Sequence, residues 1–65
     1  MVAPNAQMRI LVADNDDGMR QALVEFLQEE GYATLEASRP DEARRLLREG
    51  NVDVAVLDVR LLNDN

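Results

Sequence analysis

The chain has 65 residues, and its 13 acidic and 7 basic side chains give a formal net charge of −6 at pH 7. Every basic residue is an arginine, and the sequence contains no lysine, histidine or cysteine. These absences exclude Ser-His and Cys-His catalysis, lysine Schiff-base chemistry, thiolate zinc sites and a disulfide framework. The negative charge argues against direct binding to nucleic acid or to acidic membrane surfaces.

The apolar residues, 46% of the chain, occur in short blocks that indicate a folded domain. No block approaches the roughly 20 residues of a membrane-spanning helix. Residues 1–8 lack the positive and apolar segments of a signal peptide, so we interpret them as a flexible leader before a single domain at residues 9–65. Without cysteines to form disulfides, the chain is expected to be cytoplasmic.

The first expected strand is Ile10–Ala13, an uninterrupted apolar run that ends at the acidic turn of residues 14–17. Such a run is typical of a strand buried on both faces of a parallel sheet. A helix should follow, because apolar residues recur at three- and four-residue spacing and Gly31 supplies a stop. The expected core face of this helix comprises Met19, Ala22, Leu23, Phe26 and Leu27, with Arg20 facing elsewhere.

The middle of the chain predicts a strand and a second helix. Residues 32–37 are mixed in polarity and favour a less buried edge strand. Ser38 followed by Asp41 resembles a helix capping box, Pro40 fits the first turn, and Gly50 should end the helix. The apolar face of this helix is expected to comprise Ala43, Leu46 and Leu47.

The last expected element is Val54–Leu57, a second strand predicted to be fully buried, which stops at Asp58. The resulting β-α-β-α-β order indicates an α/β fold with a parallel sheet and right-handed crossovers. If the strand order is flavodoxin-like, the first and third strands are neighbours at the point where the winding reverses. Asp14 and Asp58 would then converge, with Asn15 and Asp16 close by.

The two strand-end aspartates suggest a chemistry. Crowded carboxylates repel one another unless a cation neutralises them, and Mg²⁺ prefers such oxygen ligands. A carboxylate beside Mg²⁺ can also attack a phosphoryl group, and Asp58 is the best placed for that role. Two structural alternatives remain open, because the acids of residues 14–17 can cap a helix and Asp58 can simply terminate a strand.

At these residues the chain resembles the receiver domain of bacterial two-component response regulators, a flavodoxin-like α/β domain. By this resemblance, the family domain continues with two more strands and three more helices, which carry a hydroxyl residue and a lysine that contact the phosphoryl group. The chain is therefore expected to be the N-terminal half of a receiver domain. The matching segments are Arg9 to Asp16, Met19-Arg20, Glu30 to Tyr32, Ala37-Ser38, Glu42-Ala43 and Val52 to Leu61.

The resemblance implies a phosphoacceptor and a metal site. Asp58 matches the phosphoacceptor aspartate, and the Mg²⁺ ligands would be Asp14, Asn15, Asp58 and the backbone carbonyl of Arg60. Asn15 stands where the family usually has a second acid, so Mg²⁺ binding is expected to be weak. Leu62 stands where most members have proline, which would loosen the loop after Asp58.

The function implied is that of a non-enzymatic phosphoacceptor, which takes a phosphoryl group from a histidine kinase or phosphotransfer protein and switches conformation. The 65-residue chain alone is expected to take up little label, because it has no lysine. A runner-up interpretation is an interaction module that self-associates through an exposed Val54–Leu57 edge. A Mg²⁺-dependent phosphohydrolase is the weakest alternative, since no second acid lies two residues after Asp58.

Overall fold

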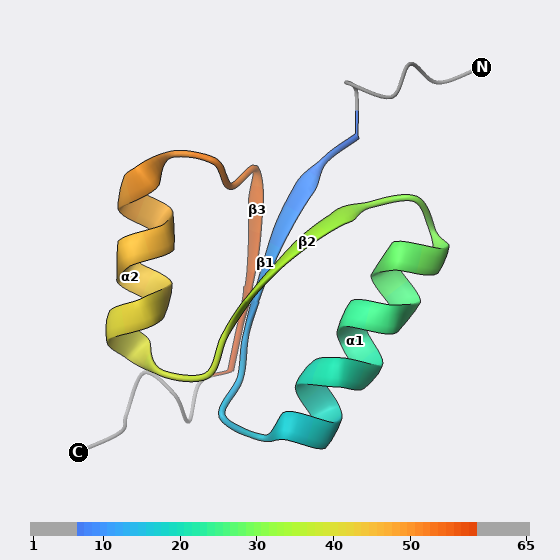
Figure 1. The fold of residues 1–65 in the computed structure, drawn as a ribbon, viewed down its shortest axis with the longest axis horizontal. Helices are drawn as coiled ribbons and strands as arrows, with labels where there is room; N and C mark the ends of the chain where they lie inside the picture. Colours follow the sequence, from blue (N-terminus) through green and yellow to red (C-terminus); the bar gives the residue numbers. More distant parts are fainter. Residues whose placement is uncertain (1–6, 59–65) are drawn as a thin grey trace.

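A computed structural model of the chain describes residues 7–58. The elements alternate along the chain, and the strands are parallel in the order β2-β1-β3, with one helix on each side of the sheet (Figure 1). The predicted α/β fold, a partial flavodoxin-like β-α-β-α-β unit, is confirmed. In this described part of the chain, neither helix has the length and apolarity needed to cross a bilayer. The elements are β1 (Arg9–Ala13), α1 (Asp17–Glu29), β2 (Ala33–Ala37), α2 (Pro40–Glu49) and β3 (Val54–Leu57).

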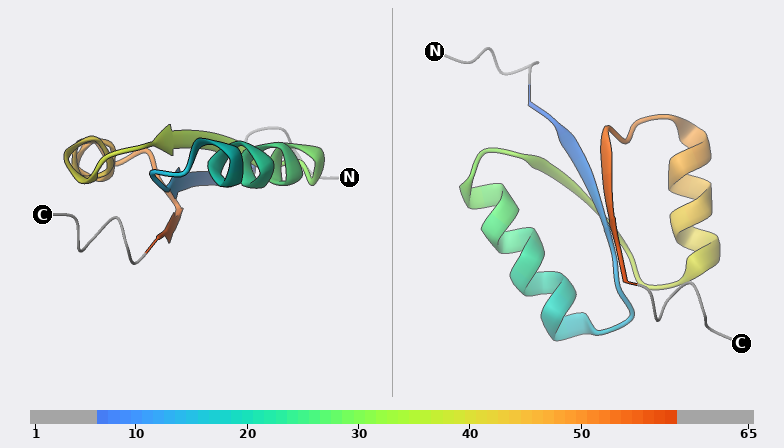
Figure 2. Two further views of the ribbon diagram at one scale, coloured as in Figure 1. Left: turned by 90° about the horizontal axis from the view of Figure 1, so that it is seen from below. Right: turned by 180° about the vertical axis from the view of Figure 1, so that it is seen from behind.

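Strand β1 lies in the middle of the sheet because it is apolar at nearly every position and therefore loses contact with water on both faces. Seen along the strands, it lies between β2 and β3, with α1 and α2 to either side (Figure 2). Side chains alternate between the two faces. Ile10 and Val12 pack with Val24 of α1, while Leu11 and Ala13 pack in the cluster that holds Ala43 of α2.

Fewer residues of helix α1 pack against the sheet than the spacing of its apolar residues predicted. Val24 is buried, and Leu23 and Leu27 pack beside it. Met19 and Phe26, which were expected in the core, are 56% and 58% exposed. The apolar arc of α1 is wider than the sheet can cover, because the helix lies mainly over β2 and β1. The helix axis is rotated so that Val24 is at the centre of the contact.

Both helices end where the sequence predicted. Gly31, with φ +95°, follows α1 and donates its N–H to the Gln28 carbonyl, while the N–H of Tyr32 reaches the Leu27 carbonyl. This pair of bonds is a Schellman motif, which favours glycine at its left-handed position. Gly50, with φ +79°, closes α2 by donating to the Leu47 carbonyl.

The predicted capping box of α2 is wrong. Pro40 occupies the start of the helix, so the N-cap is Arg39, which makes no side-chain capping bond. The Ser38 backbone N–H instead donates to Glu42 Oε1 at 3.0 Å. Glu42 therefore reaches back across the first turn, as an acid does in a capping box, but it satisfies the residue before the cap. Asp41 pairs with Arg39 at 3.2 Å.

Strand β3 is not fully buried, contrary to the sequence prediction. Val54, Val56 and Leu57 are 40%, 41% and 39% exposed. The reason is its place in the sheet, because among residues 7–58 it pairs with β1 alone, and the contacts of both helices are concentrated on β1 and β2. The apolar run predicted the strand correctly, but not its surroundings.

Candidate functional site

The parallel register brings Asp14 and Asp58 to the same edge of the sheet. Ala13 of β1 pairs with Leu57 of β3, and the next residue of each strand is an aspartate. The Asp58 N–H donates to the Ala13 carbonyl at 3.0 Å, which continues the ladder past the last paired residues. Neighbouring strands are about 4.8 Å apart, so the two aspartates occupy adjacent places at the carboxyl edge, where α/β sheets bind ligands.

Asp14 forms hydrogen bonds through both its backbone N–H and its carboxylate. Its backbone N–H donates to the Ala37 carbonyl of β2 at 3.0 Å, which fixes the residue to the end of the sheet. Its Oδ1 accepts the Asp16 N–H at 2.9 Å, an Asx turn that starts the loop toward α1. Asp14 is 7% exposed, and within residues 7–58 it is the only charged residue that is buried. Its carboxylate therefore organises the loop and also faces a largely dehydrated surrounding.

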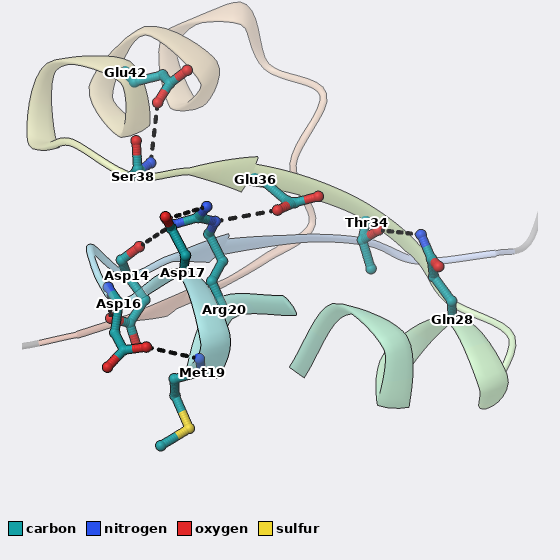
Figure 3. Close-up of polar contacts among 10 residues, drawn as sticks. All are labelled: Asp14, Asp16, Asp17, Met19, Arg20, Gln28, Thr34, Glu36, Ser38 and Glu42. Atoms are coloured by element: carbon teal, nitrogen blue, oxygen red, sulfur yellow. Dashed lines mark hydrogen bonds and ion pairs between the residues drawn. The ribbon is translucent and has the colours of Figure 1, made fainter. Parts of the chain in front are cut away.

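The other two polar residues of the loop have different surroundings. Asp16 is the N-cap of α1, and its Oδ1 accepts the Met19 N–H at 2.9 Å (Figure 3). The capping alternative raised by the sequence thus holds for Asp16. It does not account for Asp14, whose carboxylate bonds within the loop and not to the helix. Asn15 lies between them and is exposed.

Arg20 contacts the loop after β1, although the sequence pattern placed it on another face of the helix. Its Nη1 donates to the Asp14 carbonyl oxygen at 2.8 Å, and its Nη2 and Nε reach Asp17 Oδ1 at 2.7 Å and Glu36 Oε1 at 3.2 Å (Figure 3). The side chain is only 13% exposed, so the expectation that it faces away from the sheet is wrong. The signal was its spacing, because it precedes Val24 by one helical turn.

Arg20 stays charged at every accessible pH. Its hydrogen bond to Asp17 raises the pKa of the guanidinium above its usual value, against partial desolvation, and Glu36 raises it further. A cationic group whose pKa is raised in the folded state contributes stability below its unfolded-state pKa. This contribution is lost only as the pH rises through the folded-state pKa. That window lies above neutrality by many units for arginine, so these ion pairs contribute no pH dependence near pH 7.

The oxygen atoms that could hold a cation come from two carboxylates and one amide. Within residues 7–58, no group of three or more histidine, cysteine, aspartate or glutamate side chains could hold a metal ion. The predicted ligand set needs only two carboxylates, those of Asp14 and Asp58. The Asn15 amide and the carbonyl of Arg60 complete it. The last of these, with Leu62, lies outside the described residues. Hard oxygen donors of this kind suit Mg²⁺.

A separate hollow lies over the start of α2. Its volume is about 530 Å³, and none of the predicted site residues lines it. Its lining is polar and charged, and two of its arginines are paired with acids, Arg39 with Asp41 and Arg45 with Glu49. It is therefore distinct from the edge that carries Asp14 and Asp58.

Comparison with known proteins agrees with this geometry. The family model described as the response regulator receiver domain matches residues 10–65. No match was found to a curated protein or to a solved structure. The match begins with β1 and includes both strand-end aspartates. The chain therefore belongs to the response regulator receiver domain family.

Proposed function

We propose that this chain is a phosphoacceptor receiver unit, in which Asp58 takes a phosphoryl group from a histidine kinase or a phosphotransfer protein. The observation that carries the proposal is the register of β1 and β3, which brings Asp58 beside Asp14 at the carboxyl edge of the sheet. Family membership gives the receiver function, and this pair of acids supplies the residues for its chemistry.

The proposed transfer is a displacement at phosphorus. A carboxylate oxygen of Asp58 forms a bond to the phosphorus atom while the bond from phosphorus to the donor breaks, and the donor leaves with that electron pair. The product is an aspartyl phosphate, and a small donor such as acetyl phosphate would leave as acetate. The added negative charge next to Asp14 is the change to which the loop and helix can respond.

Asp14, Asn15, Asp58 and the Arg60 carbonyl are the proposed ligands of Mg²⁺. When bound, the ion would neutralise the charge on the transferring phosphoryl oxygens. The protein residues do the positioning, since Asp14 is fixed to β2 through its N–H and to the loop through Oδ1. Asn15 contributes an uncharged oxygen, so we propose weak binding.

Labelling with acetyl phosphate and Mg²⁺ tests the phosphoacceptor. We expect hydroxylamine-labile label on the wild-type chain, well below one phosphoryl group per molecule because no lysine is present to oppose the developing charge. Asp58→Asn should abolish it. Asp53→Asn, at the opposite end of β3, is the matched control and should label as wild type. Label that survives Asp58→Asn would overturn the assignment.

Calorimetric titration with MgCl₂ tests the metal. Asn15→Asp restores a formal charge opposite the ion and should tighten binding, because hard cations are held chiefly by charged oxygens. The matched control is Asn51→Asp, an exposed residue before β3 and away from the carboxyl edge. An Asn15→Asp variant with unchanged affinity would remove Asn15 from the ligand set.

A second candidate function is self-association, and the exposure of β3 favours it. Val54, Val56 and Leu57 are each about 40% exposed on a strand that pairs with β1 alone among the described residues. An exposed apolar edge strand is a template for pairing with another chain. We expect dimers or larger species by sedimentation at micromolar concentration, and Val56→Lys should shift them to monomers. A monodisperse, cooperatively folded wild-type monomer would rule this candidate out.

A further inference from the structure

Arg20 joins three parts of the chain that meet at the candidate site. It begins on the first turns of α1, pairs with Asp17 of the same helix at 2.7 Å, and reaches Glu36 on β2 at 3.2 Å. Its third contact is to the backbone, where Nη1 donates to the Asp14 carbonyl at 2.8 Å. Only 13% of the Arg20 side chain is exposed, whereas its acidic partners Asp17 and Glu36 are 85% and 45% exposed.

The contact to the Asp14 carbonyl fixes the peptide unit between Asp14 and Asn15. The two following peptide units are held as well. Asp14 Oδ1 accepts the Asp16 N–H at 2.9 Å, and the Asp16 carbonyl accepts the Arg20 backbone N–H at 2.9 Å. Arg20 therefore contacts the loop through both its backbone and its side chain. The orientation of the Asp14–Asn15 peptide limits where the side-chain oxygens of Asp14 and Asn15 can lie.

We infer that Arg20 is a positioning residue for the acidic site: it locks the Asp14–Asn15 peptide and so sets the geometry of the oxygen ligands. The inference rests on the proposed Mg²⁺ site for its consequence, but not for its geometry. Groups that orient metal ligands without touching the ion typically account for 10–100-fold in affinity. Arg20 stands in that relation to Asp14 and Asn15.

The role requires an arginine and not merely a positive charge. Three nitrogen atoms of one planar group make three separate contacts, in directions fixed by the guanidinium. A lysine carries the same charge on a single nitrogen and cannot span the Asp14 carbonyl, Asp17 and Glu36 together. Arg20→Lys therefore removes the geometry while it keeps the net charge, which separates positioning from long-range electrostatics.

The experiment compares wild type, Arg20→Lys and Arg45→Lys by titration with MgCl₂ and by the amide resonance and hydrogen exchange of Asp16. Arg45 is the matched control, because it makes an ordinary exposed pair with Glu49 at 3.1 Å on α2. We expect Arg20→Lys to weaken Mg²⁺ binding at least tenfold and to shift the Asp16 amide with faster exchange. Arg45→Lys should leave both within about twofold of wild type. Wild-type affinity and an unchanged Asp16 amide in Arg20→Lys would overturn the inference.

Two further outcomes are covered. If wild type binds no Mg²⁺, the proposed metal site fails, and the Asp16 amide alone tests whether Arg20 positions the loop. If Arg20→Lys does not fold, Glu36→Asp replaces it, since this change keeps the charge but withdraws the carboxylate from Nε. Glu36→Asp should weaken Mg²⁺ binding about twofold to fivefold and move the Asp16 amide. No response in either measurement would overturn the inference.

Discussion

Strands β1 and β3 have similar apolar sequences, but β1 is buried and β3 is exposed. Each is an uninterrupted apolar run followed by an aspartate, and the two runs pair with each other residue by residue. In β1, Leu11 and Val12 are completely buried, whereas their register partners on β3, Ala55 and Val56, are both exposed, Val56 to 41%. The difference shows that an apolar run specifies a strand, while the number of neighbours specifies its burial.

The physical basis of this difference is the pairing of the sheet. β1 donates and accepts hydrogen bonds on both sides and carries a helix on each face, so its four apolar side chains, at residues 10–13, are buried. Within residues 7–58, β3 has one partner strand, and the helices lie mainly over β1 and β2. Burying apolar area stabilises a fold by about 25 cal/mol per Å², so the same residue type contributes much more in β1.

The largest expected effect comes from placing a charge at paired positions of the two strands. Val12 and Val56 are register partners, but Val12 is fully buried and Val56 is exposed. Val12→Lys should prevent folding, because an unpaired buried ammonium costs several kcal/mol and a chain of this size has only about 3–10 kcal/mol to lose. Val56→Lys should keep the wild-type circular dichroism spectrum. Equal loss of structure in both variants would show that β1 and β3 do not differ in burial.

A smaller effect is expected from the same truncation in both strands. Leu11→Ala should lower the free energy of unfolding by about 2–5 kcal/mol, the usual cost of a cavity in a close-packed core. Leu57→Ala should cost less than about 1 kcal/mol, since water already reaches this side chain and no cavity remains. Urea denaturation at fixed protein concentration measures both. A cost for Leu57→Ala as large as that of Leu11→Ala would mean that β3 is covered in solution.

The smallest effect is expected at the turn after β1. It separates the stability contributed by this turn from the stability contributed by the burial of β1. Asp16→Ala removes the N-cap bond to the Met19 N–H and should lower stability by about 1 kcal/mol. Arg39→Ala is the control, because Arg39 occupies the N-cap of α2 without a side-chain capping bond. Thermal denaturation should show a lower midpoint for Asp16→Ala alone. A similar loss for Arg39→Ala would contradict the capping assignment.

Local patterns in the sequence determined the elements and the edge of the sheet where the chemistry lies. Four consecutive apolar residues predicted β1 and β3, glycines marked the ends of both helices, and an aspartate after each run predicted the meeting of Asp14 and Asp58. These features depend on backbone preference and on short spacing, which neighbouring residues in the chain fix by themselves. The parallel register followed from the alternation of strands and helices.

Which surfaces are covered, and which residues surround Arg20, depends on how the helices and strands pack together. The spacing of apolar residues in α1 predicted Phe26 in the core, but the contact with β1 and β2 buries Val24 and leaves Phe26 exposed. Asp17 is a local partner of Arg20 at helical spacing, but Asp14 and Glu36 come together with Arg20 only when β1, α1 and β2 pack. Burial and long-range hydrogen bonds depend on residues far apart in the chain, and a local pattern carries no information about them.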